Sequence, residues 1–383
     1  MKKRAALYPY NYHVTPLVRY RQFIQKYDLV SVVAPKGLSL AGKDASVADE
    51  GLFIGINVTD DLLSVLDDVD VLIVAEYELD SVPDFKYRVL NGILDAMKRG
   101  KDIYCLQRFE DPTVCFLNQY AQGCRVQFFY ELQEDRVESE SAISMINTVS
   151  TPVVCTIGVS ETSCKFEVQL AMRKVFESMG YSVSQVLSKN YGKILGAHAF
   201  PQFMFERGHT EEEKILAFNQ FVGKIEREEN PDLILLGIPG GFLPINENNP
   251  NHYCILPTEV TQAIPIDYMV ATILEEQVLE KSLREMNNIL HYKYGAVHTS
   301  FAVSNTRLNM NSLIDISFEK VVFDILSPKD CTDLPCKPEK LQPPFYWIHS
   351  EVQMKSLCEE IETILSRNYE NQSAGYRMEG RLR

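Results

Sequence analysis

Residues 151–170 combine a buried-type strand, a short polar turn and the first turns of a helix. They read TPVVCTIGVSETSCKFEVQL, and the helix carries Lys165 close to its start. A strand that turns tightly into a helix points free backbone N–H groups at the turn, and such a turn favours an anion. The stretch therefore predicts a phosphate-binding loop in an α/β fold.

The loop departs from the standard spelling of that motif. In the pattern G-x-x-x-x-G-K-[ST] read from Gly158, the second glycine, the lysine and the hydroxyl fall on Ser163, Cys164 and Lys165. The lysine comes one place late, and Phe166 follows it in place of a magnesium-binding hydroxyl. The sequence thus predicts an altered anion site.

The turn itself is polar. It contains Ser160, Glu161, Thr162 and Ser163. A carboxylate beside a triphosphate is repulsive unless a metal ion lies between them, so Glu161 is unexpected in a nucleotide site. We expect Gly158, Lys165 and the three hydroxyl residues to contact a ligand. The alternative is a tight turn inherited from such a fold, with Lys165 merely solvated.

A second candidate segment, residues 233–241, reads LILLGIPGG and predicts a buried parallel strand that ends in a glycine-rich turn. In many P-loop enzymes an acid ends this strand and holds magnesium, but here Gly237 stands at that place. Gly240 and Gly241 allow close backbone approach to a ligand, or they simply form a sharp chain reversal. The chain thus lacks both the hydroxyl and the acid that hold magnesium in P-loop enzymes, which argues against simple ATP turnover.

Four further residues are candidates for chemistry. Cys164, at a helix start beside a lysine, is the one plausible nucleophile, and His198 is its possible partner. A cysteine without a catalytic role is the alternative. Glu259 and Asp267 flank a segment that we expect at the carboxyl edge of the sheet, where they are candidate metal or substrate groups.

Composition narrows the function classes. The formal charge of −14 over 383 residues argues against a nucleic-acid or anionic-membrane surface. No apolar run is long enough to span a bilayer and no signal peptide can be written, so we expect a cytoplasmic protein. The nine cysteines show no zinc-type spacing, so a metal or disulfide framework is not expected.

Alternating strands and helices predict an α/β fold with two domains and mainly parallel sheets. Residues 1–127 predict a Rossmann-like domain, but no G-x-G-x-x-G follows its first strand, which disfavours ordinary dinucleotide binding. Residues 128–150 include an acidic run and predict a linker. We expect a degenerate P-loop-like domain at 151–328 and a C-terminal extension with a terminal helix at 329–383.

Five segments together resemble a clostridial family of peptide maturation system proteins. They read YPYNYHVTPLVRY, PKGLSLAGKD, GVSETSCKFEVQL, YGKILGAHAFP and LILLGIPGG. The resemblance implies a role in making a ribosomally synthesised, bacteriocin-like peptide, with the precursor peptide and a radical SAM maturase as partners. More remotely, the layout is similar to proteins that join a Rossmann-like domain to a dethiobiotin-synthetase-like P-loop domain.

The leading expectation is an accessory or modifying protein in peptide maturation, with an anion or substrate site at the altered loop. One alternative is a nucleotide-dependent ligase or transferase that uses Lys165 for phosphate and Glu259 or Asp267 for a metal ion. Another is a non-catalytic protein that binds the precursor peptide. A nucleotide is the only cofactor that the sequence suggests.

Overall fold

The computed structural model describes most of the chain as two compact units. The described residues are 2–37, 40–77, 84–130, 145–247, 250–311, 322–327 and 343–379, with side chains to 367. The first unit comprises Met1–Arg136 and Asn190–Ala199, and the second comprises Val137–Lys189 and Phe200–Arg383.

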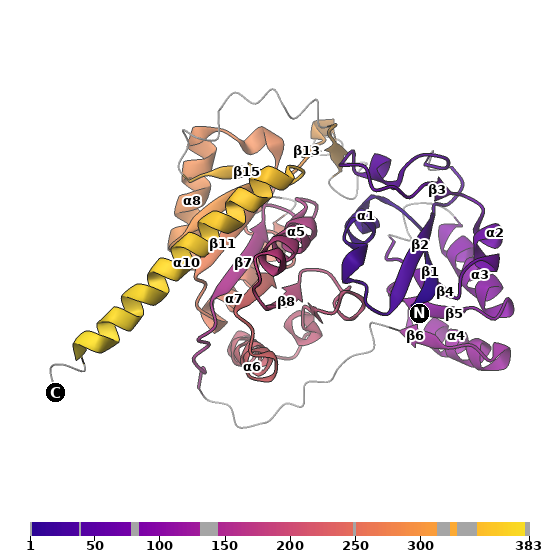
Figure 1. The fold of residues 1–383 in the computed structure, drawn as a ribbon, viewed down its shortest axis with the longest axis horizontal. Helices are drawn as coiled ribbons and strands as arrows, with labels where there is room; N and C mark the ends of the chain where they lie inside the picture. The colour runs from indigo at the N-terminus through magenta and orange to yellow at the C-terminus, as the bar shows by residue number, and fades with distance from the viewer. Residues whose placement is uncertain are drawn as a thin grey trace. The chain divides into compact units, whose positions relative to one another are not determined.

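The first unit is built on a six-stranded parallel sheet in the order β3-β2-β1-β4-β5-β6 (Figure 1). This is the doubly wound order of Rossmann folds. The apolar run of β4 is buried at every position, because helices cover both faces of such a sheet. The strands are β1 (Lys3–Tyr8), β2 (Tyr27–Val33), β3 (Val58–Thr59), β4 (Val71–Val74), β5 (Asp102–Cys105) and β6 (Phe128–Tyr130).

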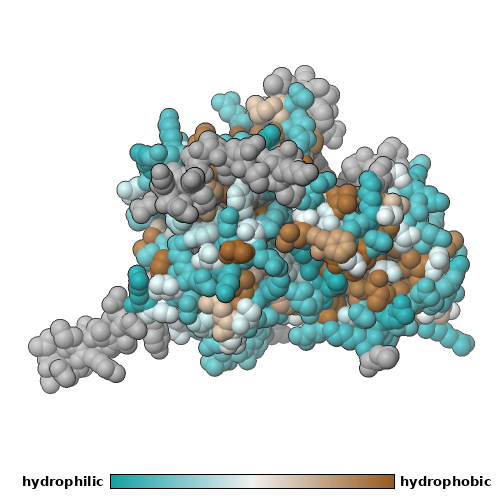
Figure 2. Space-filling model, turned by 45° about the horizontal axis from the view of Figure 1, so that its top comes forward, coloured by the Kyte–Doolittle hydropathy of each residue, from teal (hydrophilic) through white to brown (hydrophobic). Residues whose placement is uncertain are grey.

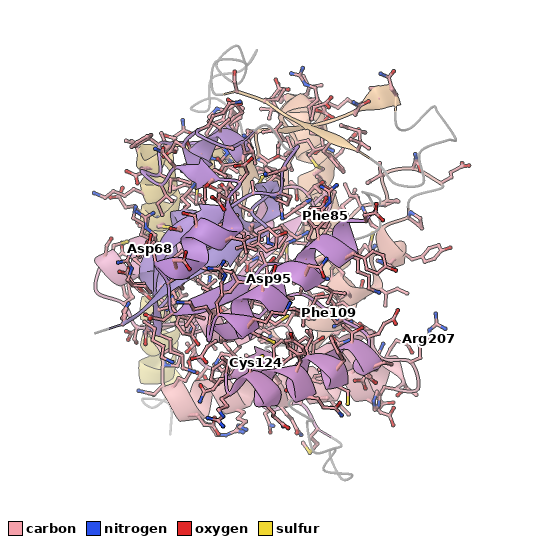
Figure 3. The ribbon with its side chains drawn as sticks, turned by 90° about the vertical axis from the view of Figure 1, so that its right-hand side faces the viewer. Asp68, Phe85, Asp95, Phe109, Cys124 and Arg207 are labelled. Carbon is pink, nitrogen blue, oxygen red and sulfur yellow. The ribbon has the colours of Figure 1, made fainter. Side chains whose placement is uncertain are left out.

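Apolar side chains at helical spacing attach the helices of this unit to its sheet. Val89, Ile93 and Met97 lie on the buried face of α3 and join the core. Figure 3 shows α3 and α4 side by side, with Phe85 at the start of α3 and Phe109 just before α4. The α-helices are α1 (Thr15–Arg19), α2 (Leu62–Asp67), α3 (Phe85–Lys98) and α4 (Asp111–Cys124), and the 3-10 helices are η1 (Tyr12–Val14), η2 (Arg21–Phe23), η3 (Ala45–Ala48) and η4 (Lys193–Leu195).

The second sheet has the order β15-β12-β11-β7-β10-β8-β9 and places β7 at its centre. The chain runs from β7 to β8 and β10 on one side and then crosses to β11 on the other, so the carboxyl end of β7 is a topological switch point, where ligands bind in open α/β sheets. The strands are β7 (Val153–Gly158), β8 (Val183–Leu187), β9 (His198–Ala199), β10 (Leu233–Gly237), β11 (Tyr268–Ile273), β12 (Thr299–Val303) and β15 (Phe345–Trp347), with a separate antiparallel pair, β13 (Thr306–Leu308) and β14 (Phe323–Ile325).

Helix α5 is the most enclosed helix segment around this sheet. It is buried at nine consecutive positions, 165–173, because it contacts β7, β8 and β10 and also α10. Helix α6 begins with a capping box formed by Thr210 and Glu213. The α-helices are α5 (Lys165–Ser178), α6 (Glu211–Glu229), α7 (Ile255–Ala263), α8 (Glu280–Tyr294) and α10 (Glu351–Glu379), and the 3-10 helices are η5 (Gln202–Phe205), η6 (Asn251–Cys254) and η7 (Glu275–Gln277).

The α/β class with two mainly parallel sheets is confirmed, and two predicted segments need correction. The predicted linker 128–150 begins with β6, which pairs with β5 at the edge of the first sheet. The predicted extension 329–383 contains β15, which pairs in parallel with β12, and α10, which packs on α5. Residues 131–144 and 328–342 lie outside the described residues.

Hydrophilic side chains cover most of the face seen in Figure 2, with smaller apolar patches between them. Within the described ranges, no helix combines the length and the apolar character needed to cross a bilayer.

Candidate anion-binding site

The loop between β7 and α5 is one residue longer than the standard phosphate-binding motif. It still ends, as the motif does, with a left-handed residue followed by a lysine at the helix start. β7 ends at Gly158 and α5 begins at Lys165. Cys164, just before the helix, has φ 60° and ψ 24°, a left-handed conformation that glycine adopts most easily. Cys164 thus takes the place of the second glycine, and Lys165 follows it as the lysine does in the motif.

Lys165 lies at the buried centre of this loop. Its side chain is 1% exposed, and its ammonium donates to the carbonyl oxygens of Ser160, at 2.8 Å, and Gly240. A third contact joins Nζ to Glu161 Oε2 at 3.3 Å. Burial lowers the pKa of Lys165, and the Glu161 carboxylate opposes that shift. The alternative of a merely solvated Lys165 is therefore wrong.

The carboxylate of Glu161 lies against two donors that an anion would use. Its Oε2 contacts the Lys165 ammonium and also accepts the backbone N–H of Gly240 at 2.6 Å. Burial raises the pKa of Glu161, but the charges of Lys165 and Lys189 and the Gly240 N–H outweigh it, so the pKa is lowered. Glu161 is therefore ionised at neutral pH, and its side chain is 48% exposed.

The hydroxyl groups of the loop make different contacts. Ser163 is buried, and its Oγ donates to the Ser160 carbonyl at 2.8 Å and shares a 2.7 Å hydrogen bond with Thr272 of β11. The Ser160 and Thr162 hydroxyls lie 3.2 Å apart, and Thr306 donates to the Thr162 carbonyl at 3.3 Å. Ser163 thus stabilises the loop from inside, whereas Thr162 is half-buried.

Three of the predicted glycines adjoin this loop. A Cβ on Gly158 would lie 2.3 Å from Ser163 Oγ, and a Cβ on Gly241 would lie 2.4 Å from Asn251 Nδ2, so both positions need glycine for close packing. Gly240 has φ 80°, and a Cβ there would meet no atom within 4 Å. The space beside Gly240 is therefore open.

The remaining predicted glycine, Gly237, lies beneath the side chain of Gln169 from α5. A Cβ on Gly237 would be 2.2 Å from Gln169 Nε2. The Gln169 amide is fully buried; it donates to Ser188 Oγ at 2.9 Å and accepts the Ser188 N–H at 3.1 Å. The place of the strand acid is thus filled by a neutral amide that is hydrogen-bonded through both its nitrogen and its oxygen.

We expect Gly237→Ala to lower the free energy of unfolding by about 1–3 kcal/mol, because the added methyl group overlaps the Gln169 amide. Urea denaturation followed by circular dichroism measures the change. Gly123→Ala in α4 is the matched control, since a Cβ there would meet no atom within 4 Å and alanine favours the helix. Equal midpoints for the two variants would contradict this packing.

A left-handed turn lies next to the loop. Asn251, His252, Tyr253 and Cys254 have φ values of 49°, 51°, 56° and 56°, and each such residue costs about 1–2 kcal/mol. Asn251 Nδ2 donates to the carbonyl oxygens of Val159, at 3.0 Å, and Leu243. Backbone strain of this kind concentrates at functional sites, and the sequence carries no local pattern that predicts it.

The candidate nucleophile Cys164 contacts Asn305, with 4.0 Å between Sγ and Oδ1. Its proposed partner His198 lies on β9, in the segment Asn190–Ala199 that groups with the first unit. The Cys164–His198 pair therefore stays a prediction.

Cys164→Gly tests the conformational role of this position. We expect the free energy of unfolding to rise by about 1 kcal/mol, because glycine relieves the left-handed strain. Cys164→Ala removes the thiol but keeps the strain, so it should bring no such gain. Thermal unfolding of both variants measures the difference, and a glycine variant less stable than the alanine variant would refute this assignment.

The two candidate metal residues do not lie together at the loop. Glu259 of α7 is buried, its Oε1 lies 3.9 Å from Lys214 Nζ of α6, and burial raises its pKa. Asp267 precedes β11 and accepts the N–H of Val153, the first residue of β7, at 2.8 Å. It therefore lies at the sheet edge opposite the loop, and our placement of it at the carboxyl edge is wrong.

Across the described ranges, no group of three or more His, Cys, Asp or Glu side chains is arranged to hold a metal ion.

The ligand crevice expected of a Rossmann sheet contains two polar contacts to Glu76 in the first unit. It lies beyond the carboxyl ends of β1 and β4, the switch point of the sheet. There Asn11 donates to the Glu76 carbonyl at 3.4 Å, and the fully buried Tyr191 donates to the Glu76 carboxylate at 3.0 Å.

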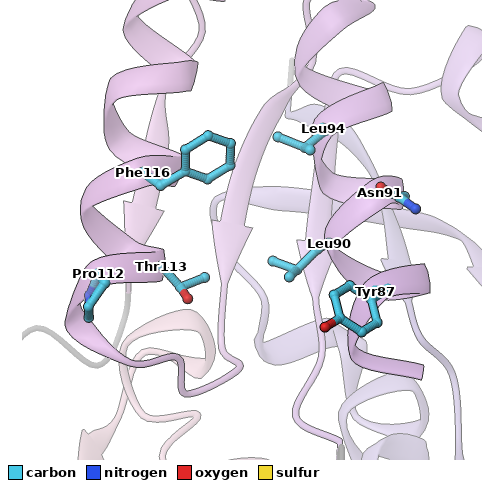
Figure 4. A pocket seen from close by; sticks show the side chains of 7 residues that line it. All are labelled: Tyr87, Leu90, Asn91, Leu94, Pro112, Thr113 and Phe116. Carbon is cyan, nitrogen blue, oxygen red and sulfur yellow. The ribbon is translucent and has the colours of Figure 1, made fainter. Parts of the chain in front are cut away.

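A groove of about 340 Å³ lies between α3 and α4 of the first unit (Figure 4). It is lined by Tyr87, Leu90, Asn91, Leu94, Pro112, Thr113 and Phe116. None of these lining residues carries a positive charge, whereas the loop at the end of β7 holds the Lys165 ammonium. The loop at the end of β7 is the stronger candidate.

Comparison with known proteins supports the fold. A solved DUF1611 family protein from Anabaena variabilis is similar over 79% of this chain and 88% of its own, with 13% identity and a TM-score of 0.55. An apo GTPase from Pyrococcus abyssi covers 56% of this chain and 97% of its own, with 14% identity and a TM-score of 0.31. An S. aureus homoserine dehydrogenase covers 34% of this chain and 33% of its own, with 14% identity and a TM-score of 0.25. No family model and no curated protein matches the sequence. The fold and the loop together define a two-unit α/β protein of the Rossmann and P-loop-like class.

Proposed function

We propose that the second unit binds a phosphate-bearing small molecule at the loop between β7 and α5. The observation that carries this proposal is the buried ammonium of Lys165, which lies at the first residue of α5 close to the Gly240 N–H. An ammonium and a backbone donor converging at a helix N-terminus suit a phosphoryl oxygen. A buried cation also disfavours a neutral ligand.

The same residues fit an anion better than a magnesium nucleotide bound in the Walker manner. Phe166 is buried where a magnesium-binding hydroxyl would stand, and Gly237 with Gln169 replaces the strand acid. A nucleotide remains a possible ligand through its phosphates. Of the two metal candidates of the ligase or transferase alternative, Asp267 lies at the opposite sheet edge and Glu259 lies 3.9 Å from Lys214.

The role in peptide maturation rests on the sequence resemblance alone. Within that proposal, the bound anion would serve the maturation of a ribosomally made precursor peptide alongside a radical SAM maturase. Co-purification with the precursor peptide at micromolar concentration tests it, and failure to co-purify would count against it.

Thermal unfolding in the presence of phosphates tests the anion proposal. We expect inorganic tripolyphosphate to raise the melting temperature, since a ligand at about 100 times its Kd adds about 2.7 kcal/mol, or roughly 5 °C or more. ATP and GTP, with and without Mg²⁺, show whether a base or a metal ion adds affinity. No shift with any of these phosphates would reject the proposal.

A further inference from the structure

We infer that Glu161 is a built-in competitor for the anion site, and that a ligand binds by displacing its carboxylate from Lys165 and Gly240. This inference rests on the proposed function of the loop. It makes Glu161 the residue that sets how strongly an anion is bound.

A single oxygen atom of Glu161 uses both donors. Oε2 lies 3.3 Å from the Lys165 ammonium and 2.6 Å from the Gly240 nitrogen. A phosphoryl oxygen at these donors would lie next to the carboxylate, and two such anions repel each other. The carboxylate and the ligand therefore exclude each other.

The contacts of Lys165 and of Glu161 indicate which of the two side chains moves when a ligand binds. Lys165 is held by the carbonyl oxygens of Ser160 and Gly240 in addition to Glu161, and its side chain is 1% exposed. Glu161 is 48% exposed and lies beside the open space at Gly240. The carboxylate can thus turn into solvent while the ammonium stays in place.

Glu161→Gln removes the charge at nearly constant volume. We expect this variant to bind tripolyphosphate about tenfold more tightly, because the ligand no longer competes with an ion pair. Without ligand, the variant should melt at a lower temperature than the unmodified protein, since Lys165 loses its anionic partner. Tripolyphosphate should then restore more stability to the variant than to the unmodified protein.

The matched control is Glu177→Gln on α5, the helix that carries Lys165. Glu177 pairs with Arg173 at 2.7 Å, also four residues apart, and the exposures are similar, 38% for the carboxylate and 8% for the cation. This pair lies in the second half of α5, away from the loop. We expect its tripolyphosphate affinity to equal that of the unmodified protein.

Isothermal titration calorimetry with magnesium-free tripolyphosphate compares the three proteins. Tighter binding by Glu161→Gln alone supports the inference. Equal or weaker binding by that variant, with measurable binding by the unmodified protein, overturns the inference and leaves the proposed function standing. Absence of binding in all three rejects the proposed function and the inference with it.

A second readout uses the unmodified protein and does not depend on how the variant folds. The Gly240 amide exchanges a carboxylate acceptor for a phosphate when Glu161 is displaced. Its ¹H–¹⁵N signal should therefore shift on tripolyphosphate addition, and the Glu161 carboxyl ¹³C signal should move with it. A bound state in which the Glu161 carboxyl signal stays unchanged would overturn the inference.

Discussion

Lys165→Met is expected to lower the affinity for tripolyphosphate at least about 100-fold. Methionine keeps most of the buried volume of the lysine stem but removes the ammonium that faces the ligand. Hydrogen bonds to charged groups contribute about 1.5–3 kcal/mol each, and a 100-fold loss corresponds to about 2.7 kcal/mol. Isothermal titration calorimetry at one fixed salt concentration measures the change.

Lys174→Met on the same helix is the control for this substitution. Lys174 pairs with Glu351 at 3.0 Å on the protein surface, with 52% of its side chain exposed. Because it lies outside the loop, its replacement should leave the affinity unchanged. Equal losses in both variants would mean that the lysines act only through overall charge.

The second large effect is expected in α10, where Leu357→Ala and Ile361→Ala should each lower the free energy of unfolding by about 2–5 kcal/mol. Both side chains are fully buried, and α10 contacts α5 and β15. The helix is thus part of the core of the second unit and not an added segment. Urea denaturation of the single variants measures the loss.

Val352→Ala is the matched control on the same helix, because this side chain is 77% exposed. We expect it to change stability by no more than about 0.5 kcal/mol. If the Leu357 and Ile361 variants unfold at the same urea concentration as this control, α10 does not contribute to the core.

Polar contacts attach the same helix to the sheet. Glu360 accepts the Tyr268 hydroxyl of β11 at 2.8 Å and also the Tyr346 hydroxyl of β15. Burial, together with the Glu360 charge, raises the pKa of Tyr268 above its ordinary value. These contacts join α10 to β15, the strand just before it in the sequence, and to β11, which lies far from it in the sequence.

Long, regular elements were predictable from local pattern. The strand, turn and helix expected in residues 151–170 and the buried strand expected in residues 233–241 agree with β7, α5 and β10, because each has a clear apolar run or helical start. The two- and three-residue strands β3, β6 and β15 were missed. Such strands carry too few residues for a pattern, and pairing with a neighbouring strand alone defines them.

The candidate site was predictable in its parts but not in its contacts. The sequence named Gly158, Lys165 and Gly240, which the structure brings together at one loop. It did not predict that Glu161 accepts the Gly240 N–H or that Asn251 supports the loop, because these contacts join residues 79 and 92 positions apart. Neither contact leaves a local signal.

One missed contact did have a signal in the sequence. A glycine in an otherwise bulky strand indicates close approach by another group, and Gly237 ends such a strand, β10. Gln169 lies four residues after Lys165, one helical turn along α5, and its amide fills that space. The pair explains why a strand acid cannot be added at Gly237 without a change at Gln169.

A crystal structure of the protein grown with tripolyphosphate is the most direct test of the anion site. We predict a phosphate group within hydrogen-bond distance of Lys165 Nζ and the Gly240 N–H, with the Glu161 side chain turned away from both. Tripolyphosphate bound only elsewhere, with Glu161 still on Lys165, would contradict the assignment of this loop as the binding site.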